Sequence, residues 1–488
     1  MEKKKRKKAK LPLLIINFII FSLLIVSSVF FVYTMYNTGI VPIKYILITG
    51  GVLELITIVD FIFIIRKVRI PSIIFDVLLV LIIVVEALSI PKMKEFIDFI
   101  QYNFNNEYEI SVYNIMVSSS SSYNSLEDLN GKTIILLDET NDDKLKNQIN
   151  EKIKDAKFTE TEDIVTDMNK LKTNKNMIII ADSSYYDTQI ANDAEYETKV
   201  KVLDTIEIKE EKKEEKNSGE NKNVTKNSFI IYISGIDTRS NSMPARSLSD
   251  VNILMAVNPD TKKILLVHTP RDYYVQLHGT TGLPDKLTHA GTKKGGIKVS
   301  KATMEDLYDI DIDFYMRVNF KSVIKVVDAI GGINIYNDQK YTVHSYVDNT
   351  CSFKPGWNNN VSGKCALAFA RERHAYSTGD KHRGENQEQV LTRIIEKITS
   401  SKVLLNKYTD ILKSLNNSFE TDMSSEKMTS LVRMQLDDMA KWEITPYNVT
   451  GKGAMDYTYS YPHQKLSVIK PNYDTVNTAK TKIKEVLG

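Results

Sequence analysis

The run Phe-Ile-Ile-Tyr-Ile-Ser at residues 229–234, followed at once by Gly-Ile-Asp-Thr-Arg at residues 235–239, sets the fold class of the C-terminal half of the chain. Short apolar runs rich in β-branched residues predict buried strands. Two more such runs follow at residues 253–258 and 264–268, joined by a Pro-Asp-Thr turn. Helical patterns come next, one ending at Gly331-Gly332 and one with an apolar stripe at residues 385–398. Strands alternating with helices predict an α/β fold, here an α-β-α sandwich over residues 228–488.

The N-terminal end carries three long apolar runs, at residues 11–33, 45–65 and 72–90. Each has roughly the 17–25 residues that a helix needs to cross a bilayer. Basic clusters at residues 3–10 and 66–69 belong in the cytoplasm by the positive-inside rule. We therefore predict that residues 1–92 form a three-helix membrane anchor, with a cytoplasmic N-terminus and an extracytoplasmic chain from about residue 92 onward. A cleavable signal peptide is the alternative for the first run, which is long for such a signal and is followed by two further spans.

Charge and composition exclude several classes of protein. The 488 residues carry a formal charge of +3, but residues 1–92 carry +7 and the remaining residues −4. A nucleic-acid-binding domain needs a cationic face, so we expect no nucleic-acid partner. Two cysteines do not make a disulfide-dense scaffold or a thiolate cluster, and the seven histidines show no metal-binding spacing.

Two segments separate the anchor from the sandwich. Residues 93–208 contain strand-like runs at 133–137 and 177–181 with a helical pattern at 142–157 between them, which predicts a small α/β accessory domain. That segment shows no constellation of catalytic residue types. Residues 209–227 are predicted to be a linker, because 11 of the 19 are charged and only Val224 is apolar.

Two aspartates lie at predicted strand ends. Asp237 follows the first strand of the sandwich and Asp250 precedes the second. Ligand sites gather at strand ends in α/β sheets, and paired carboxylates suit Mg²⁺, or Mn²⁺, beside a phosphate. An aspartate at a strand end is equally common as a turn cap, so the pair alone is weak evidence.

Cationic side chains recur at the same kind of position. Arg271 and Asp272 follow a strand, Arg371 and Arg373 would share one face if that segment is extended, and Arg383 and Gln387 share a face of a predicted helix. Arginine suits bidentate phosphate recognition. For each arginine alone a surface salt bridge is the more common role. Their repeated placement at element ends favours a shared pyrophosphate site.

These segments resemble the motifs of the LytR-CpsA-Psr phosphotransferases, in the order of that family. They include Gly-Ile-Asp-Thr-Arg at 235–239, Ser-Asp at 249–250, Pro-Arg-Asp at 270–272 and Asp-Lys-Leu-Thr-His-Ala at 285–290. Val-Asp-Ala-Ile-Gly-Gly at 327–332, Ala-Leu-Ala-Phe-Ala-Arg-Glu-Arg at 366–373 and Gly-Asp-x-x-Arg-x-x-x-Gln at 379–387 complete the set. The resemblance covers residues 229–400, and the three-span anchor with an intervening module is similar to the capsule-type CpsA subgroup.

The resemblance implies a membrane-anchored enzyme that moves a glycopolymer from a polyprenyl-pyrophosphate carrier to peptidoglycan. It implies Mg²⁺ held by Asp237 and Asp250. The implied pyrophosphate-binding residues are Arg239, Arg271, Lys286, Arg371, Arg373, Arg383 and Gln387. The sequence departs from the family at Leu248 and Asn386, where arginines are usual.

The implied reaction is a direct attack of a sugar hydroxyl on the phosphorus that bears the glycan, with Arg271, Asp272, Arg371 and Arg373 as catalytic residues. Asp272 is the candidate general base, with a structural salt bridge as the alternative. Two other functions remain open. One is hydrolysis of the same lipid pyrophosphate by water, and the other is a non-enzymatic membrane factor that only binds the lipid carrier.

Cys351 and Cys365 lie 14 residues apart in the predicted extracytoplasmic part. A disulfide closing this loop would stabilise the fold by roughly 3 kcal/mol. Two free thiols are the alternative.

Overall fold

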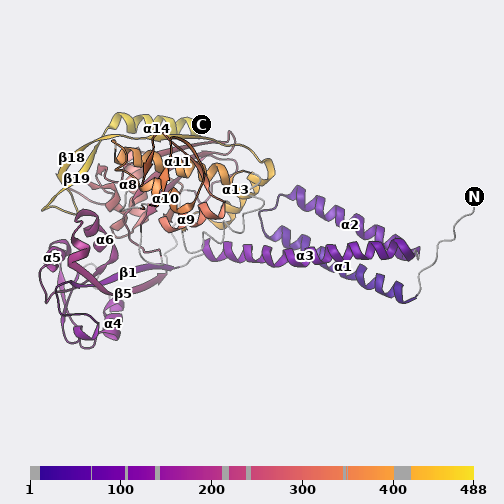
Figure 1. Cartoon of the computed structure of the whole chain (residues 1–488), viewed down its shortest axis with the longest axis horizontal. Coiled ribbons are helices and arrows are strands. Elements are labelled where there is room, and N and C mark those ends of the chain that lie inside the picture. Colours follow the sequence, from indigo (N-terminus) through magenta and orange to yellow (C-terminus); the bar gives the residue numbers. More distant parts are fainter. Residues whose placement is uncertain are drawn as a thin grey trace, which may run out of the picture. The chain divides into compact units, whose positions relative to one another are not determined.

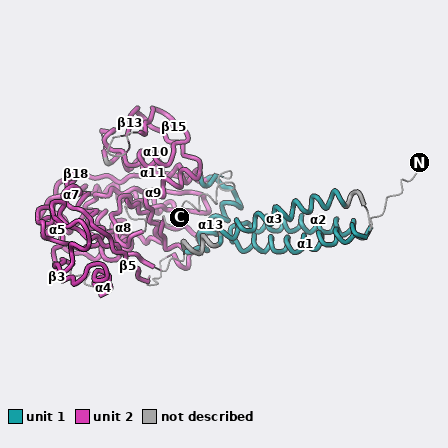
Figure 2. Tube along the Cα trace, turned by 60° about the horizontal axis from the view of Figure 1, so that its bottom comes forward, with its two compact units in different colours: residues 1–105, 398–413, 424–441 teal, residues 106–397, 414–423, 442–488 magenta. Residues whose placement is uncertain are grey.

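The computed structural model describes residues 11–66, 69–104, 108–137, 143–211, 219–237, 243–343, 348, 350–377, 379–400 and 419–488. The chain divides into two compact units, coloured separately in Figure 2. Residues 1–105, 398–413 and 424–441 make the first unit. Residues 106–397, 414–423 and 442–488 make the second. We describe each unit by itself.

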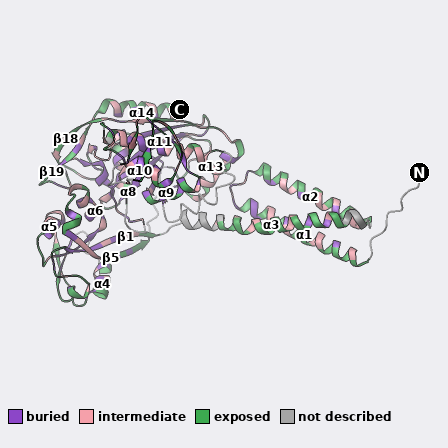
Figure 3. Ribbon diagram, viewed as in Figure 1, coloured by how far each residue is buried: buried purple, intermediate pink, exposed green. Residues whose placement is uncertain are grey.

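The first unit contains the three predicted apolar helices, α1 (Leu11–Asn37), α2 (Ile43–Ile65) and α3 (Arg69–Phe104). Each has a segment long and apolar enough to cross a membrane. Most of the exposed large apolar side chains described in the chain lie on these helices (Figure 3), which suits a hydrocarbon environment. The third helix continues past Pro91 to Phe104, beyond the predicted end at residue 90, because polar residues extend the same helix after the apolar run ends.

Polar contacts join parts of this unit that are far apart in the sequence. The hydroxyls of Ser27 and Ser28 on α1 donate to the carboxylate of Glu86 on α3, at 2.5 and 2.8 Å. Hydroxyl–carboxylate bonds of this kind hold helices together in lipid. Helix α13 (Ser425–Asp438) also belongs to this unit, and Lys44 Nζ lies 2.8 Å from Asp437 Oδ1. The start of α2 therefore contacts a segment that comes late in the chain.

The accessory region of the second unit is an α/β module with a five-stranded sheet in the order β3-β2-β4-β1-β5. Its strands β2, β3 and β4 are parallel, as strands joined by crossover helices must be, and β1 runs antiparallel to β4 and β5. Apolar clusters fill both faces of this sheet. The strands are β1 (Tyr108–Ser118), β2 (Thr133–Leu137), β3 (Lys157–Thr161), β4 (Ile178–Asp182) and β5 (Val200–Glu211). The helices are η1 (Glu127–Leu129), α4 (Asp143–Lys152), α5 (Ile164–Leu171), α6 (Ser183–Asn192) and α7 (Tyr196–Lys199).

The segment predicted to be a linker is partly structured. Strand β5 continues to Glu211 because its last residues pair with Tyr108–Ile110 at the start of β1. Val224, the one apolar residue of this segment, is 2% exposed. Charge content alone did not reveal these pairings, since they depend on a strand a hundred residues away.

The sandwich contains the predicted strands in a six-stranded sheet of order β16-β11-β6-β7-β8-β17. Strand β6 pairs antiparallel with β7 and parallel with β11, and β8 pairs antiparallel with β7 and parallel with β17. The six are β6 (Phe229–Ile236), β7 (Val251–Asn258), β8 (Lys263–Thr269), β11 (Phe314–Asn319), β16 (Phe419–Thr421) and β17 (Glu443–Asn448).

Helices cover both faces of this sheet, which makes the predicted three-layer sandwich (Figure 1). On one face, α8 (Ile297–Tyr308) and α14 (Tyr473–Leu487) bury their apolar side chains against alternate residues of β6, β7 and β8. On the other face, Phe320 of α9 (Phe320–Ala329) lies near Gly235 of β6, and α11 (Asp380–Ile398) packs Gly384 against His268 of β8. The central strands are therefore shielded from water on both sides.

Short elements complete the second unit. They are β9 (Tyr274–Val275), β10 (Asp285–Lys286), η3 (Leu287–Thr292), β12 (Ile333–Asn337), β13 (Tyr341–Thr342), β14 (Ser352–Phe353), β15 (Gly356–Val361), α10 (Gly363–Arg371), β18 (Gly451–Tyr457) and β19 (Lys465–Pro471).

Candidate functional site

The candidate site lies at one edge of the six-stranded sheet. Strands β6 and β8 end there and β7 begins there, because β7 runs antiparallel to both. Asp237 follows β6, Asp250 precedes β7, and Arg271 and Asp272 follow β8. The topology thus brings together predicted site residues from three segments.

Asp250 is held in place by a buried polar network. The neighbouring Ser249 hydroxyl lies 3.0 Å from Tyr232 Oη and 2.6 Å from Ser234 Oγ, and it donates to Asn252 Oδ1. The Asp250 carboxylate accepts a short hydrogen bond from Arg271. Burial raises the pKa of Asp250 although Arg271 acts against the rise. Because the ionised carboxylate is buried, a cation beside it stabilises its charge.

Asp272 lies between two cations. Its Oδ1 is 3.6 Å from Arg271 Nε and 3.4 Å from Lys286 Nζ. Burial alone would raise the pKa of Asp272, but Arg271, Lys286 and Arg383 outweigh burial and lower it. The group stays ionised, which favours the salt-bridge alternative over general-base catalysis, since a base of depressed pKa accepts protons poorly.

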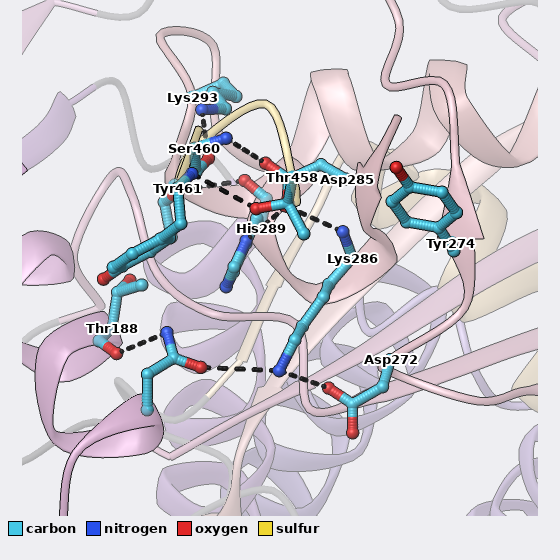
Figure 4. Close-up of polar contacts among 12 residues, drawn as sticks. Thr188, Asp272, Tyr274, Asp285, Lys286, His289, Lys293, Thr458, Ser460 and Tyr461 are labelled. Atoms are coloured by element: carbon cyan, nitrogen blue, oxygen red, sulfur yellow. Dashed lines mark hydrogen bonds and ion pairs between the residues drawn. The ribbon is translucent and has the colours of Figure 1, made fainter. Parts of the chain in front are cut away.

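Lys286 is presented by a rigid turn (Figure 4). The Asp285 carboxylate accepts from the Ser460 backbone N–H at 2.9 Å and lies 2.7 Å from His289 Nδ1. Burial would raise the pKa of Asp285, but His289 and Lys293 lower it below its usual range. The Asp-Lys-Leu-Thr-His motif thus contains a buried Asp–His pair that fixes the turn, a role the sequence analysis did not assign.

Arg371 approaches the cluster from another direction. Its guanidinium lies 3.2 Å from Asp237 Oδ2 and stacks over the Phe320 ring. Arg371 is the last residue of α10, so residues 371–373 are not one extended stretch. The proposed shared face of Arg371 and Arg373 therefore has no basis in a strand. Arg373 is exposed, and its Nε lies 3.3 Å from His374 Nε2.

Arg383 and Gln387 lie on α11 above the end of β8, one helical turn apart as predicted. Arg383 opposes the rise that burial causes in the pKa of Asp250, and it helps to lower the pKa of Asp272. The close approach depends on Gly384, where an added Cβ would lie 2.5 Å from His268 Cε1. Gln387 is nearly buried beside His268. Arg239 lies outside the described residues.

Two buried titratable groups, His268 on β8 and Glu388 on α11, were missed by the sequence analysis. Burial, together with Arg383, lowers the pKa of His268 to about 4, so this imidazole is neutral at pH 7. Burial raises the pKa of Glu388 to about 8, although it accepts hydrogen bonds from the Tyr447 N–H and from Asn448. Neither has a local sequence signal, because both depend on β17, which joins the sheet from far along the chain.

The two positions that depart from the family motif have structural roles. Leu248 is buried, 8% exposed. The Asn386 side chain donates to the Phe369 carbonyl oxygen at 3.0 Å and so joins α11 to α10, the helix that carries Arg371.

Asp237 and Asp250 could share a divalent ion with a bound phosphate, in place of the arginines that pair with them here, Arg371 and Arg271. Asp237 and Asp250 are near enough that Asp237 raises the pKa of Asp250. Magnesium is commonly held in proteins by one or two carboxylates, with substrate phosphates and water completing its shell. Within the described ranges, no group of three or more His, Cys, Asp or Glu side chains could hold a metal by itself. Two carboxylates and a bound phosphate would therefore have to share the ion.

Cys351 and Cys365 form a disulfide with Cα atoms 5.5 Å apart. It joins the loop before β14 to α10 and so tethers the helix that carries Arg371.

Comparisons with known proteins show which family this chain is similar to. The model of the LytR_cpsA_psr family matches residues 194–475, more than half of the chain. Biofilm regulatory protein A of Streptococcus mutans is 31% identical over 235 residues, which cover 46% of this chain and 57% of that protein. A polyisoprenyl-teichoic acid–peptidoglycan teichoic acid transferase, TagU of Enterococcus faecalis, is 30% identical over 51% of this chain and 74% of its own. The chain thus spans less than two thirds of the Streptococcus relative. The crystal structure of B. subtilis TagV aligns with 54% of this chain and 98% of its own, at 26% identity and a TM-score of 0.45.

Proposed function

This chain belongs to the LytR_cpsA_psr family, and from that premise we propose that it is a membrane-anchored phosphotransferase. It moves a glycopolymer from a polyprenyl-pyrophosphate carrier to peptidoglycan on the outer face of the membrane. Relatives that are named for transferring teichoic acid to peptidoglycan support the class of reaction.

One observation carries the proposal. Four cationic side chains from four separate segments, Arg271, Lys286, Arg371 and Arg383, surround three carboxylates at one edge of the sheet. A pyrophosphate has the charge that such a cluster binds, and arginine forks match its oxygens. The three apolar helices support membrane anchoring, which keeps the enzyme beside a lipid-linked substrate.

The chemistry follows from charge neutralisation. An acceptor sugar hydroxyl attacks the phosphorus that bears the glycan, the bond from that phosphorus to the bridging oxygen breaks, and polyprenyl phosphate leaves. The arginines bind and orient the phosphoryl oxygens and stabilise the charge that develops on them. Asp250 and Asp272 hold the Arg271 guanidinium between them, and the hydroxyl proton passes to solvent. Mg²⁺ held by Asp237 and Asp250 would supply further neutralisation of the pyrophosphate.

The test uses the full chain in lipid nanodiscs with a polyprenyl-pyrophosphate-linked glycan, peptidoglycan oligomers and Mg²⁺. We expect a product in which glycan phosphate is joined to peptidoglycan, and its loss with chelator. Arg271→Ala should lower the rate about 100-fold, in the range for removing one transition-state donor. The matched control is Arg393→Ala, since Arg393 lies on the same helix as Arg383 but pairs with Glu396 and stacks over Trp357.

Other outcomes would contradict the proposal. Free glycan phosphate as the only product would indicate hydrolysis. Normal cell-wall polymer in cells carrying Arg271→Ala or Asp237→Ala would indicate a non-enzymatic role in binding the lipid carrier.

A further inference from the structure

The accessory module reaches the phosphate-binding cluster through the end of α6. The Oδ1 atom of Asn192, the last residue of α6, accepts a hydrogen bond from Lys286 Nζ at 3.4 Å. The same ammonium lies 3.4 Å from Asp272 Oδ1, as Figure 4 shows. Lys286 is 7% exposed. A side chain of the accessory module therefore contacts Lys286 directly, and we place Lys286 in the pyrophosphate site.

Asn192 is itself fixed in orientation. Its Nδ2 donates to the Thr188 carbonyl oxygen one helical turn earlier, at 3.0 Å. Burial raises the pKa of Tyr461, and a hydrogen bond with Asn192 acts against that rise. Tyr461 lies beside His289 of η3, with ring centroids 6.0 Å apart. Because these contacts restrict rotation of the amide, its oxygen keeps facing Lys286.

A second connection leads from the module to Asp250. The Ala245 N–H donates to the Ile110 carbonyl oxygen of β1 at 2.6 Å, and Pro244 forms an isolated parallel bridge with Ile110. Arg317 of the sandwich donates to the Pro244 and Ala245 carbonyl oxygens from the opposite side. The segment that ends at Asp250 is thus held between the accessory sheet and the catalytic sheet.

Electrostatics strengthens this second connection. Asp182, at the end of β4 in the accessory module, is 2% exposed, and Arg246 lies close enough to oppose the rise that burial causes in its pKa. A buried carboxylate needs such a partner, because an isolated buried charge is costly. Arg246 lies four residues before Asp250, so this electrostatic attraction acts on the same segment.

We propose that the accessory module is a positioning element of the active site, and that Asn192 is the positioning residue through which it orients the Lys286 ammonium beside Asp272. This inference rests on the proposed transferase function, because it assigns Lys286 to the same pyrophosphate site. Without Asn192, the ammonium keeps Asp272 as its carboxylate partner but loses the neutral acceptor that sets its direction.

The size of the expected effect follows from the type of bond. A hydrogen bond to a charged group is stronger than one between neutral groups, and one that is long or partly hydrated is weaker. We therefore expect loss of the Asn192 oxygen to lower kcat/KM about tenfold, which corresponds to about 1.4 kcal/mol. The Lys286 ammonium takes part both in binding the phosphate and in the reaction. Loss of its orientation should therefore lower kcat by a larger factor than it raises KM.

The experiment compares three variants of the full chain in nanodiscs, assayed with a polyprenyl-pyrophosphate-linked disaccharide and peptidoglycan oligomers. Asn192→Leu removes the oxygen at similar volume, and Asn192→Asp keeps an oxygen facing Lys286. The matched control is Asn124→Leu, because Asn124 Oδ1 accepts from Lys201 Nζ at 2.8 Å within the accessory module, with no catalytic lysine involved. We expect about a tenfold loss for Asn192→Leu only, with unchanged thermal unfolding of all three.

A double-mutant cycle separates positioning from general damage. If Asn192 acts through Lys286, Asn192→Leu has no further effect on kcat in a Lys286→Met background. Additive losses in the double variant would overturn the inference, as would an Asn192→Asp variant as impaired as Asn192→Leu, or full activity of Asn192→Leu. Failure of the proposed function is distinguishable, because wild-type protein would then form no joined product at all.

Discussion

Arg271 stands between Asp250 and Asp272 and is the residue that connects the two carboxylate positions of the candidate site. Its neighbours explain why a lysine would not replace it well. A guanidinium presents several donors in a plane and can contact both carboxylates while it still faces a phosphate, whereas an ammonium is a point charge. The side chain is 18% exposed, so these contacts are only partly screened by water. Asp272 therefore helps to hold the Arg271 guanidinium in place.

Glu388 gives a pH prediction at the same scale. Its pKa is raised from the ordinary value of 4.5 to about 8, mainly by burial. The folded chain keeps this group protonated over a range in which the unfolded chain ionises it. Stability is therefore lost as pH rises from about 4.5 towards 8, and the loss is complete only above the folded pKa. Glu388→Gln keeps a neutral hydrogen-bonding group and should abolish this loss.

The measurement is thermal unfolding of wild type and Glu388→Gln from pH 5 to pH 8. We expect the variant to become the more stable protein as pH rises, by a free energy on the order of 3 kcal/mol near pH 7.5. Asp306→Asn is a suitable control, because Asp306 is an exposed partner of His278 outside this cluster. A stability difference between Glu388→Gln and wild type that does not change with pH would contradict the raised pKa.

At the scale of elements, α10 shows how a short helix can be positioned from both ends. The Asp328 carboxylate of α9 accepts from the Gly363 N–H at 2.7 Å, where α10 begins. The disulfide then ties Cys365 on α10 to Cys351, and Asn386 of α11 holds the Phe369 carbonyl near the end of the helix. Arg371 follows two residues later. The position of this arginine therefore depends on three elements besides its own.

The disulfide gives a prediction at this scale. Replacing both cysteines by serine should lower the stability of the sandwich by about 3 kcal/mol, because the unfolded chain regains the entropy of a loop of about 15 residues. Denaturant unfolding followed by far-UV circular dichroism measures the change. Mass analysis after alkylation should find two blocked thiols only when reductant is added.

Treatment of wild-type protein with reductant is the internal control. The chain has only two cysteines, so reduction should reproduce the midpoint of the double serine variant. Two thiols that are alkylated without reductant would show that the bond does not form.

At the scale of the whole molecule, the first unit carries a topological constraint of its own. The start of α2 contacts α13 through Lys44–Asp437, and Gly39 in the loop before α2 accepts a hydrogen bond from Arg433. That loop follows the first apolar helix, and α13 follows the third. If all three helices cross the membrane, an odd number of crossings separates the N-terminus from both segments, which puts the two segments on the same side.

Reporter fusions test the orientation. We expect a phosphatase reporter that is active only outside the cytoplasm to show activity when fused after Gly488 or after Gly39, and none after Arg66. The basic clusters at the N-terminus and between the second and third spans give the physical reason, because such clusters resist translocation. Activity from the Arg66 fusion with none from the Gly488 fusion would reverse the orientation.

How much the sequence predicts depends on the range of the interactions involved. The strands β6, β7 and β8 and the helix α11 follow from local apolar patterns, and the structure confirms each with its ends moved by a few residues. Asp237, Asp250 and Arg271 stand next to those patterns, which is why they could be named, whereas Lys286 was named from the family motif. His268, Glu388 and Asn192 could not be, because distant segments give them their contacts. His268 and Glu388 meet residues of β17, and Asn192 meets Lys286.

The amino-acid sequence by itself determined the apolar helices, the α/β class and the set of charged motifs, since each depends on neighbours within about twenty residues. Tertiary structure alone decided that β7 runs antiparallel to β6 and β8, which gathers three strand ends at one edge. It also decided that Arg371 comes from a helix end and that Asn192 of the accessory module meets Lys286. The physical reason is that the burial and the charge partners of a side chain depend on its neighbours in space. In this chain those neighbours come from segments that lie far apart in the sequence.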